Sequence, residues 1–249
     1  MIEVKNLVKK YGNHLAVDHL NFTIEEGHIY GFLGPNGAGK STTMNIMTGY
    51  LGATEGEVLI NGHDVLKEPE EAKKQIGYLP ELPPLYMDMT VREYMEFAAE
   101  LKKIPKAKRA ESIDDVEKLV KIKDVEKRLI KNLSKGYRQR VGLAQALIHD
   151  PEVLILDEPT TYVDSHFEQE FYTILEELHK TLSIIMVSHD LGTICSYVKT
   201  IACVNRELHY HNSNLISAEQ LQSYHCPIEL ITHGKIPHRV LKEHEKGKQ

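Results

Sequence analysis

A glycine-rich segment near the N-terminus constrains the fold of this chain more than any other feature. Residues Gly34–Ser41 (GPNGAGKS) match the pattern G-x-x-x-x-G-K-[ST] in full. The segment follows the apolar run Ile29–Leu33, and a helix is expected from Lys40 to about Gly49, where the glycine can end it. Glycines let backbone N–H groups turn towards phosphate oxygens, and the helix N-terminus adds positive potential. We therefore predict a phosphate-binding loop, with Lys40 reaching the β- and γ-phosphates and the Ser41 hydroxyl binding Mg²⁺.

Long apolar runs predict that this loop belongs to a parallel β-sheet covered on both faces. The runs Val153–Leu156 and Ser183–Val187 are unbroken, as strands buried on both faces require. Strands and helices alternate around them, which indicates an α/β core. Short apolar strands with turns over residues 2–33, and the pair Asn61–Gly62 after Glu57–Ile60, predict further β structure near the N-terminus.

A helical segment interrupts these sheet signals between Thr90 and about residue 146. Its apolar residues recur at helical spacing, and its charge density is high. Thr90 is a good N-cap, and Glu93 three residues later completes a capping box. The charged part from Lys102 to Lys131 is expected to be a solvated face. We predict a helical subdomain inserted into the sheet domain.

The composition argues against several classes of protein. The chain has 249 residues, of which 41% are hydrophobic, enough for one large α/β domain or two small ones. Its formal net charge of −6 argues against a nucleic-acid-binding protein. We find no apolar run of membrane-spanning length, so any association with a membrane is expected to run through a partner. The three cysteines have no paired spacing and predict no disulfide framework.

Polar residues follow both buried runs, at positions where a ligand is expected. Asp157 and Glu158 come directly after Val153–Leu156, and the carboxyl edge of a parallel sheet is where such folds bind ligands. Asp157 is a candidate for the Mg²⁺ shell, and Glu158 for orienting or deprotonating an attacking water. His189 follows the second run and is a candidate hydrogen-bond partner of the γ-phosphate or the water. The alternative for Asp157 and Glu158 is that they only begin an acidic loop after the strand. The alternative for His189 is a structural histidine.

A second motif connects these residues. The segment Leu133–Arg140 (LSKGYRQR) resembles the signature sequence of ABC ATPases, whose common form is L-S-G-G-Q. It lies shortly before Asp157–Glu158, as in that family. By the same resemblance, Tyr11 corresponds to the aromatic residue that stacks on adenine. Asp164 corresponds to the loop after the catalytic glutamate, and His189 to the switch histidine.

The resemblance covers about residues 2–210 and implies a fold. That fold is a P-loop NTPase (RecA-like) α/β core with an N-terminal antiparallel β subdomain and an inserted α-helical subdomain. The implied boundaries are 1–81 and 150–215 for the β subdomain and core, 82–149 for the helical subdomain and 216–249 for a C-terminal extension. Together these parts would form a single ABC ATPase domain.

The resemblance also implies a mechanism that needs two copies of the chain. The copies face head to tail, and each ATP lies between the phosphate loop of one copy and the signature of the other. The implied nucleotide contacts are Tyr11, Asn36, Gly37, Ala38, Gly39, Lys40, Ser41 and Thr42. The implied signature contacts are Leu133, Ser134, Lys135, Gly136 and Tyr137. The implied Mg²⁺ site is formed by Ser41, Asp157 and Glu81, and the implied catalytic residues are Glu158 and His189.

The remaining implied roles concern partners. Glu81 would lie in the loop that couples to an integral membrane permease, and Asp164 in a loop at the dimer contact. The cofactors would be ATP and Mg²⁺. The partners would be a second copy and the permease, without nucleic acid, which places the chain in the cytoplasm on the inner face of the cell membrane.

Three positions depart from the family pattern. Lys135 replaces a glycine of the signature, Tyr137 replaces its glutamine, and Glu81 stands where a glutamine is usual. The altered signature and the stretch Gly77–Glu81 resemble exporter ATPases of the ABC-2 type, a likeness that extends over residues 1 to about 160. We therefore expect an exporter-type permease as the partner.

After about residue 160 the likeness changes. The segments Cys203–Asn205, His209–His211 and Cys226–Glu229 resemble ATPases of zinc- or manganese-type metal importers. The chain is therefore interpreted as a possible recombinant, chimera or design, with a metal importer as the alternative function. The tail from His209 onwards is rich in histidine, and a zinc site there is a further hypothesis. The alternative is that this tail packs on the sheet or on the dimer contact.

Two alternatives of another class are left open. One is a soluble ABC-type ATPase of translation or DNA repair, which typically carries two ATPase halves or a long coiled coil. The single phosphate loop and the absence of sustained heptads argue against it. The other is a chain that binds ATP without turnover or coupled transport.

Overall fold

The computed structural model describes residues 1–34, 37–161, 163–188, 198, 200–205, 207–211, 228–233 and 236–241. The strands are β1 (Ile2–Tyr11), β2 (His14–Ile24), β3 (Ile29–Leu33), β4 (Glu55–Ile60), β5 (His63–Asp64), β6 (Ile76–Leu79), β7 (Val153–Asp157), β8 (Ser183–Val187), β9 (Thr200–Asn205), β10 (Glu207–His211), β11 (Ile228–His233) and β12 (Ile236–Leu241). The helices are α1 (Lys40–Met47), α2 (Pro69–Lys74), α3 (Val91–Leu101), α4 (Lys106–Leu119), α5 (Lys135–Leu147) and α6 (Ser165–Leu178), with short 3₁₀ helices η1 (Lys123–Val125) and η2 (Ile130–Asn132).

A six-stranded sheet with the order β10-β9-β3-β8-β7-β6 forms the centre of the molecule. Its strands are parallel from β9 to β6, and β10 pairs antiparallel with β9. Every residue of β3, β7 and β8 is buried, as their unbroken apolar runs predict. Because side chains alternate between the faces of a strand, this sheet must be covered on both sides.

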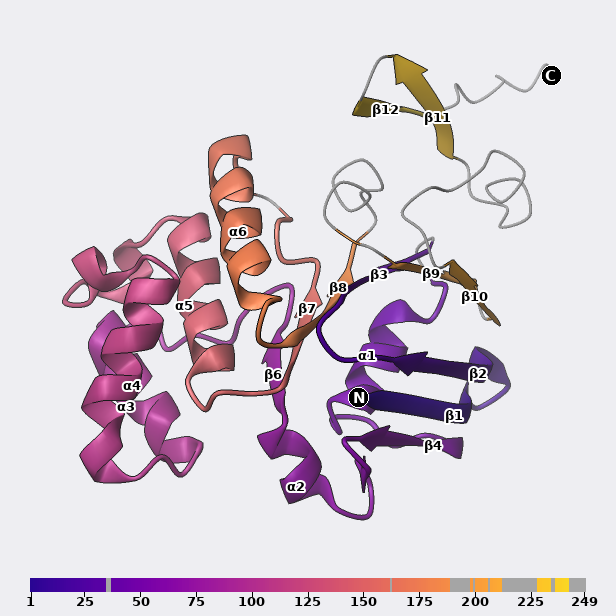
Figure 1. Cartoon of the computed structure of the whole chain (residues 1–249), viewed down its shortest axis with the longest axis horizontal. Helices are drawn as coiled ribbons and strands as arrows, with labels where there is room; N and C mark the ends of the chain where they lie inside the picture. Colours follow the sequence, from indigo (N-terminus) through magenta and orange to yellow (C-terminus); the bar gives the residue numbers. More distant parts are fainter. Residues whose placement is uncertain are drawn as a thin grey trace.

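The two faces of the sheet belong to two separate apolar cores. In β7, Leu154 and Leu156 belong to one core, and Val153 and Ile155 belong to the other. Figure 1 shows the corresponding layers, with α3–α6 on one side of the sheet and α1 with β1, β2 and β4 on the other.

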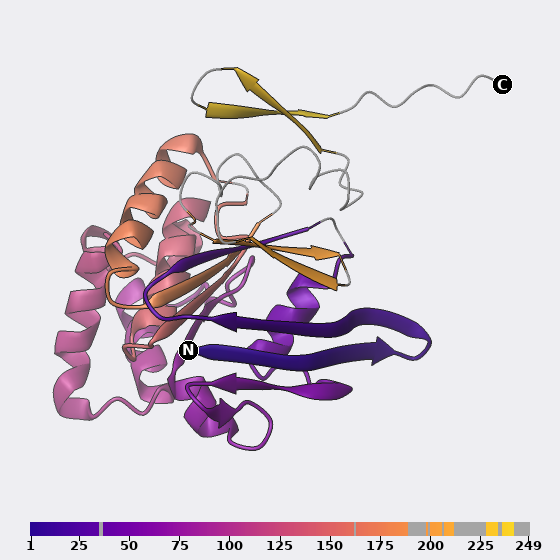
Figure 2. The same ribbon diagram turned by 45° about the vertical axis from the view of Figure 1, so that its right-hand side comes forward.

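The second layer is a four-stranded antiparallel sheet of order β2-β1-β4-β5. Figure 2 shows its longer strands β2, β1 and β4 side by side. The pair Asn61–Gly62 connects β4 to β5, and both residues have positive φ (49° and 84°). This is the turn geometry that an Asn-Gly pair favours, so the predicted hairpin is confirmed. The predicted α/β fold with an antiparallel β subdomain and an inserted helical subdomain is likewise confirmed.

The helical layer begins where the sequence predicts. The Thr90 side chain accepts a hydrogen bond from the Glu93 N–H, and the Glu93 carboxylate accepts one from the Thr90 N–H at 2.8 Å. This capping box fixes the start of α3. Among the described residues, no helix is long and apolar enough to cross a membrane.

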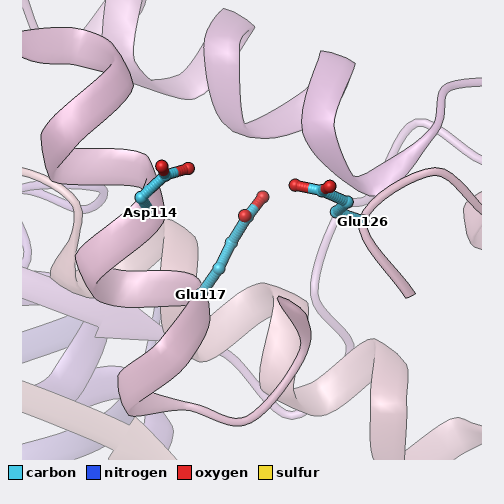
Figure 3. Close-up of side chains that lie close together, drawn as sticks. All are labelled: Asp114, Glu117 and Glu126. Atoms are coloured by element: carbon cyan, nitrogen blue, oxygen red, sulfur yellow. The ribbon is translucent and has the colours of Figure 1, made fainter. Parts of the chain in front are cut away.

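An ion-pair network stabilises the helical layer. The carboxylates of Asp114, Glu117 and Glu126 lie within 4.8 Å of one another (Figure 3). The Lys123 Nζ lies 3.0 Å from Asp114, 3.1 Å from Glu117 and 2.5 Å from Glu126, and Arg92 pairs with the first two carboxylates. Since the ammonium already lies at the position a cation would take, this cluster is a structural network that neutralises the buried Glu117.

Candidate functional site

The glycine-rich segment follows β3 and leads into α1, in the arrangement that the sequence predicts. Gly39 is the N-cap residue of α1, with φ 96° and no side-chain cap, and the first turn carries no acidic residue. A Cβ at Gly39 would lie 2.5 Å from the Ala16 carbonyl oxygen, so the loop is pressed against β2. The Lys40 Nζ donates a hydrogen bond to the Gly34 carbonyl at 2.6 Å. The helix N-terminus and the ammonium thus provide positive potential at one position.

A groove of about 620 Å³ opens beside this loop. It is lined by Tyr11, His14, Ala16, Gly37, Ala38, Gly39, Lys40, Ser41, Thr42, Glu81, Glu158 and Thr161. The groove therefore brings together residues from four separate segments of the chain (11–16, 37–42, 81 and 158–161), and nine of the sequence-predicted site residues are among them.

One end of the groove is formed by the hairpin between β1 and β2. Tyr11 is the last residue of β1 and is directly opposite His14 across the two-residue turn. The Lys9 Nζ lies 5.2 Å from the centre of the Tyr11 ring, a cation–π contact that holds the ring in place. Tyr11 is 47% exposed, so a large part of its ring remains available to a ligand.

The carboxylates lie at the carboxyl edge of the parallel sheet. Asp157 ends β7 and is buried, and among the described residues its Oδ1 atom has no hydrogen-bond partner. Burial raises the pKa of Asp157 to about 6, helped by the neighbouring Glu158 and Glu81 carboxylates and opposed by Lys40. A buried, unpaired carboxylate oxygen beside two further carboxylates fits a hard divalent cation such as Mg²⁺.

Glu158 has a strained backbone. Its φ is 49°, a left-handed conformation that costs a residue with a Cβ roughly 1–2 kcal/mol. The Glu158 N–H donates to the Val187 carbonyl at 3.0 Å, and the Thr161 hydroxyl donates to its carboxylate at 3.4 Å. These bonds hold the side chain against the groove, and such strain is often kept at functional positions.

The signature segment lies apart from the groove. Ser134 is the N-cap residue of α5 and accepts a hydrogen bond from the Tyr137 N–H at 3.3 Å. Leu133 is buried, Lys135 and Gly136 form the first turn of α5, and none of these five residues is among the groove-lining residues that the structure describes.

Two further predicted residues connect neighbouring elements. The Glu81 carbonyl, just after β6, accepts a hydrogen bond from the Gln139 Nε2 atom of α5 at 3.1 Å. Asp164 is the N-cap residue of α6 and accepts a hydrogen bond from the Phe167 N–H at 2.9 Å. Asn36 and His189 lie outside the described residues, as do Cys226 and most of the histidine-rich tail.

Three residues of the groove were not predicted from the sequence: His14, Ala16 and Thr161. His14 could have been found from the two-residue turn after Tyr11, because residues opposite each other across such a turn point to the same face. Ala16 and Thr161 carry no signal of this kind, since their position depends on how β2 and the loop after β7 meet the phosphate loop.

Comparison with known families assigns the chain. A family model described as "ABC transporter" matches residues 17–161, more than half of the chain. The chain belongs to the ABC transporter family. This match spans the phosphate loop, the signature segment and the Asp157–Glu158 pair.

Three relatives of this ABC chain differ in how much of their length is matched. An uncharacterized ABC transporter ATP-binding protein of Bacillus subtilis, YhcH, is 42% identical over 77% of this chain but over only 63% of its own length. The bacitracin transport ATP-binding protein BcrA of Bacillus licheniformis is 37% identical over 82% of this chain and 67% of its own. A probable metal transport system ATP-binding protein of Thermotoga maritima is 35% identical over 99% of both chains.

The end-to-end match to the Thermotoga protein bears on the interpretation of the chain as a chimera or design. A single relative covers both the part that resembles exporters and the part that resembles metal importers. The comparisons therefore give no support to a chimera or a design.

A solved structure shows the same fold. It is a dimeric, post-hydrolysis state of an ATP-binding cassette bound to ADP and Pi. Its TM-score to this chain is 0.76 at 25% identity, over 87% of this chain and all of the other.

Proposed function

We propose that this chain is the ATP-binding and ATP-hydrolysing subunit of an ABC transporter, which drives transport through a separate permease. The groove carries the proposal, because it brings an uncapped helix N-terminus and Lys40 together with the carboxylates of Glu81 and Glu158, beside which Asp157 lies. Positive groups suit a triphosphate, and clustered carboxylates suit a divalent cation. The dimeric cassette with bound ADP and Pi has the same fold and supports the same activity here.

The residues predicted from the sequence have proposed roles in hydrolysis. Tyr11 stacks on the adenine ring, and the backbone N–H groups of Gly37–Thr42 with the Lys40 ammonium bind the phosphates. Ser41, Asp157 and Glu81 would hold Mg²⁺, which would neutralise negative charge on the phosphates. Glu158 orients the attacking water and accepts its proton, and His189 contacts the γ-phosphate.

The signature is proposed to complete the site of a second copy. Two chains pair head to tail around two ATP molecules, and Ser134 and the Gly136 N–H at the start of α5 contact the partner's γ-phosphate. Lys135, Tyr137 and Leu133 shape that helix start, and Asp164 lies at the contact between copies. The pair would close on ATP and open after hydrolysis, and this movement would drive transport through the permease.

We expect the purified chain to release phosphate from ATP only when Mg²⁺ is present. Chelation of Mg²⁺ by EDTA should abolish turnover, because the carboxylates and phosphates that face each other in the groove then have no divalent cation to offset their repulsion. Readdition of Mg²⁺ should restore it. A coupled phosphate assay on the full chain is the measurement, and turnover that persists in excess EDTA would contradict the proposed function.

The permease surface is proposed to lie in the segment after β6, over residues 81–94. This segment exposes three large apolar side chains: Leu82 (76%), Tyr86 (54%) and Met87 (42%). The hydrogen bond from Gln139 to the Glu81 carbonyl joins it to the signature helix, so a permease bound here could sense closure of the dimer. Binding would hold the chain on the cytoplasmic face of the membrane.

An exporter-type permease is the partner we favour, because the sequence of this surface resembles ABC-2 exporters. The alternative is a metal importer, and the probable metal transport protein of Thermotoga, which matches 99% of this chain, supports a metal as the cargo. We also propose that the chain is divided into a β subdomain with the core (1–81 and 150–215), a helical subdomain (82–149) and a C-terminal extension (216–249).

Co-purification with two permeases distinguishes the partners. We expect an ABC-2 exporter permease to retain the chain in detergent, and a metal-importer permease not to retain it. Substitution of both Leu82 and Tyr86 by serine should release it, because these exposed side chains would be buried in the complex. Retention by the importer permease alone would show that the C-terminal part selects the partner.

A further inference from the structure

The signature helix and the helix after Asp164 begin side by side. A Cβ placed on Gly136, in the first turn of α5, would lie 2.5 Å from the ring of Phe167, in the first turn of α6. Figure 1 shows the two helices as neighbours in the layer that covers the sheet. The first turns of α5 and α6, which follow the N-cap residues Ser134 and Asp164, are therefore closely packed against each other.

A buried arginine joins these two helix starts. Arg140 in α5 is only 5% exposed, and its guanidinium lies 5.2 Å from the centre of the Phe167 ring and 5.7 Å from that of Tyr137. Its Nη2 atom forms an ion pair with Glu170 in α6, and its Nη1 atom donates to the Lys121 carbonyl at 3.3 Å. One guanidinium thus contacts α5, α6 and the segment after α4.

The geometry of these contacts requires an arginine. A planar guanidinium can stack on aromatic rings while its edge donates hydrogen bonds in fixed directions, which a lysine ammonium cannot do. The hydrogen bond from Arg140 also lowers the pKa of the Glu170 carboxyl, so the pair is charged at neutral pH.

Tyr137 is part of the same arrangement. It stands where the family has the glutamine of the signature, and its ring packs against the Arg140 guanidinium. Its hydroxyl donates to the Asp124 carboxylate at 3.3 Å. The Tyr137 side chain is therefore engaged within its own subunit, and it helps to fix Arg140.

We propose that Arg140 is a positioning residue: it fixes the starts of α5 and α6 relative to each other, so that the signature and the Asp164 loop meet the second copy as one rigid surface. This inference rests on the proposed ATP-dependent pairing. A misplacement of reacting groups by about 1 Å can cost roughly 100-fold in rate. Loss of this rigid link should therefore weaken dimerisation and turnover more than it lowers the stability of the fold.

The test compares Arg140→Lys with the parent, both in a Glu158→Gln background in which hydrolysis is blocked. We expect monomers of both proteins to bind a fluorescent ATP analogue within about twofold of each other, since Arg140 lies outside the groove. At saturating ATP, sedimentation should show a dimer dissociation constant at least roughly tenfold higher in the variant. With Glu158 intact, kcat should fall and the KM for ATP should stay the same.

Arg109→Lys is the matched control. Arg109 lies in α4, and its side chain donates to the Ile104 carbonyl at 2.8 Å and pairs with Glu100 at 3.5 Å, so these contacts involve neither α5 nor α6. The control should dimerise like the parent. Normal dimerisation of Arg140→Lys overturns the proposal. A melting temperature and an ATP affinity that fall in parallel with dimerisation also overturn it, because such a result indicates a purely structural role. A parent chain that binds ATP but never pairs overturns the pairing itself, and a parent that binds no ATP overturns the proposed function.

Discussion

Glu158→Gln should reduce steady-state phosphate release by roughly 10²–10⁴-fold while ATP binding is retained. Glutamine has nearly the same size and can keep the hydrogen bond from the Thr161 hydroxyl. It cannot accept a proton, so a water beside the γ-phosphate would no longer be activated. The strained backbone at φ 49° is the same in both proteins, so the two should fold alike.

The blocked variant should also accumulate dimers with ATP, because closure is then not followed by hydrolysis. Sedimentation of the chain with and without ATP measures this, beside the phosphate assay. Glu177→Gln is the matched control: this exposed carboxylate of α6 pairs with Lys180, away from the groove, and its loss should leave turnover unchanged. Equal turnover in Glu158→Gln and the parent would contradict the role proposed for Glu158.

The parts of the fold that were predicted correctly depend on short-range sequence signals. The buried strands β7 and β8, the Asn61–Gly62 turn and the capping box at Thr90 each follow from a few consecutive residues. The phosphate loop is also a local motif, since its strand, its glycines and its helix are contiguous. For these elements, local preference and tertiary structure agree.

The parts that were not predicted depend on contacts between distant segments. His14 and Thr161 reach the groove only because a hairpin and a loop about 150 residues apart in sequence meet at α1. Arg140 belongs to the signature segment, but the sequence does not show that Phe167 and Glu170 lie opposite it. The left-handed backbone of Glu158 is equally invisible in the sequence, because the carbonyl that its N–H contacts belongs to Val187 in β8, far along the chain.

The close approach of the phosphate loop to β2 leads to the second large effect. Gly39→Ala should weaken ATP binding by roughly 100-fold or more, because a left-handed residue with a Cβ costs about 1–2 kcal/mol and the forced contact about 1–3 kcal/mol more. The added Cβ would lie 2.5 Å from the backbone carbonyl oxygen of Ala16, which cannot rotate away. The loop must therefore shift, and the N–H groups at the start of α1 no longer point at the phosphates.

Gly37→Ala separates the two causes. Gly37 also has a left-handed backbone, with φ 81°, but a Cβ there meets no atom within 4 Å. Only the backbone cost applies, so the expected loss of ATP affinity is about 5–30-fold. Calorimetric titration with ATP, together with the melting temperature of each variant, measures the difference. Equal losses in the two variants would mean that the contact with Ala16 does not set the shape of the loop, and that the left-handed conformation alone determines how it binds phosphate.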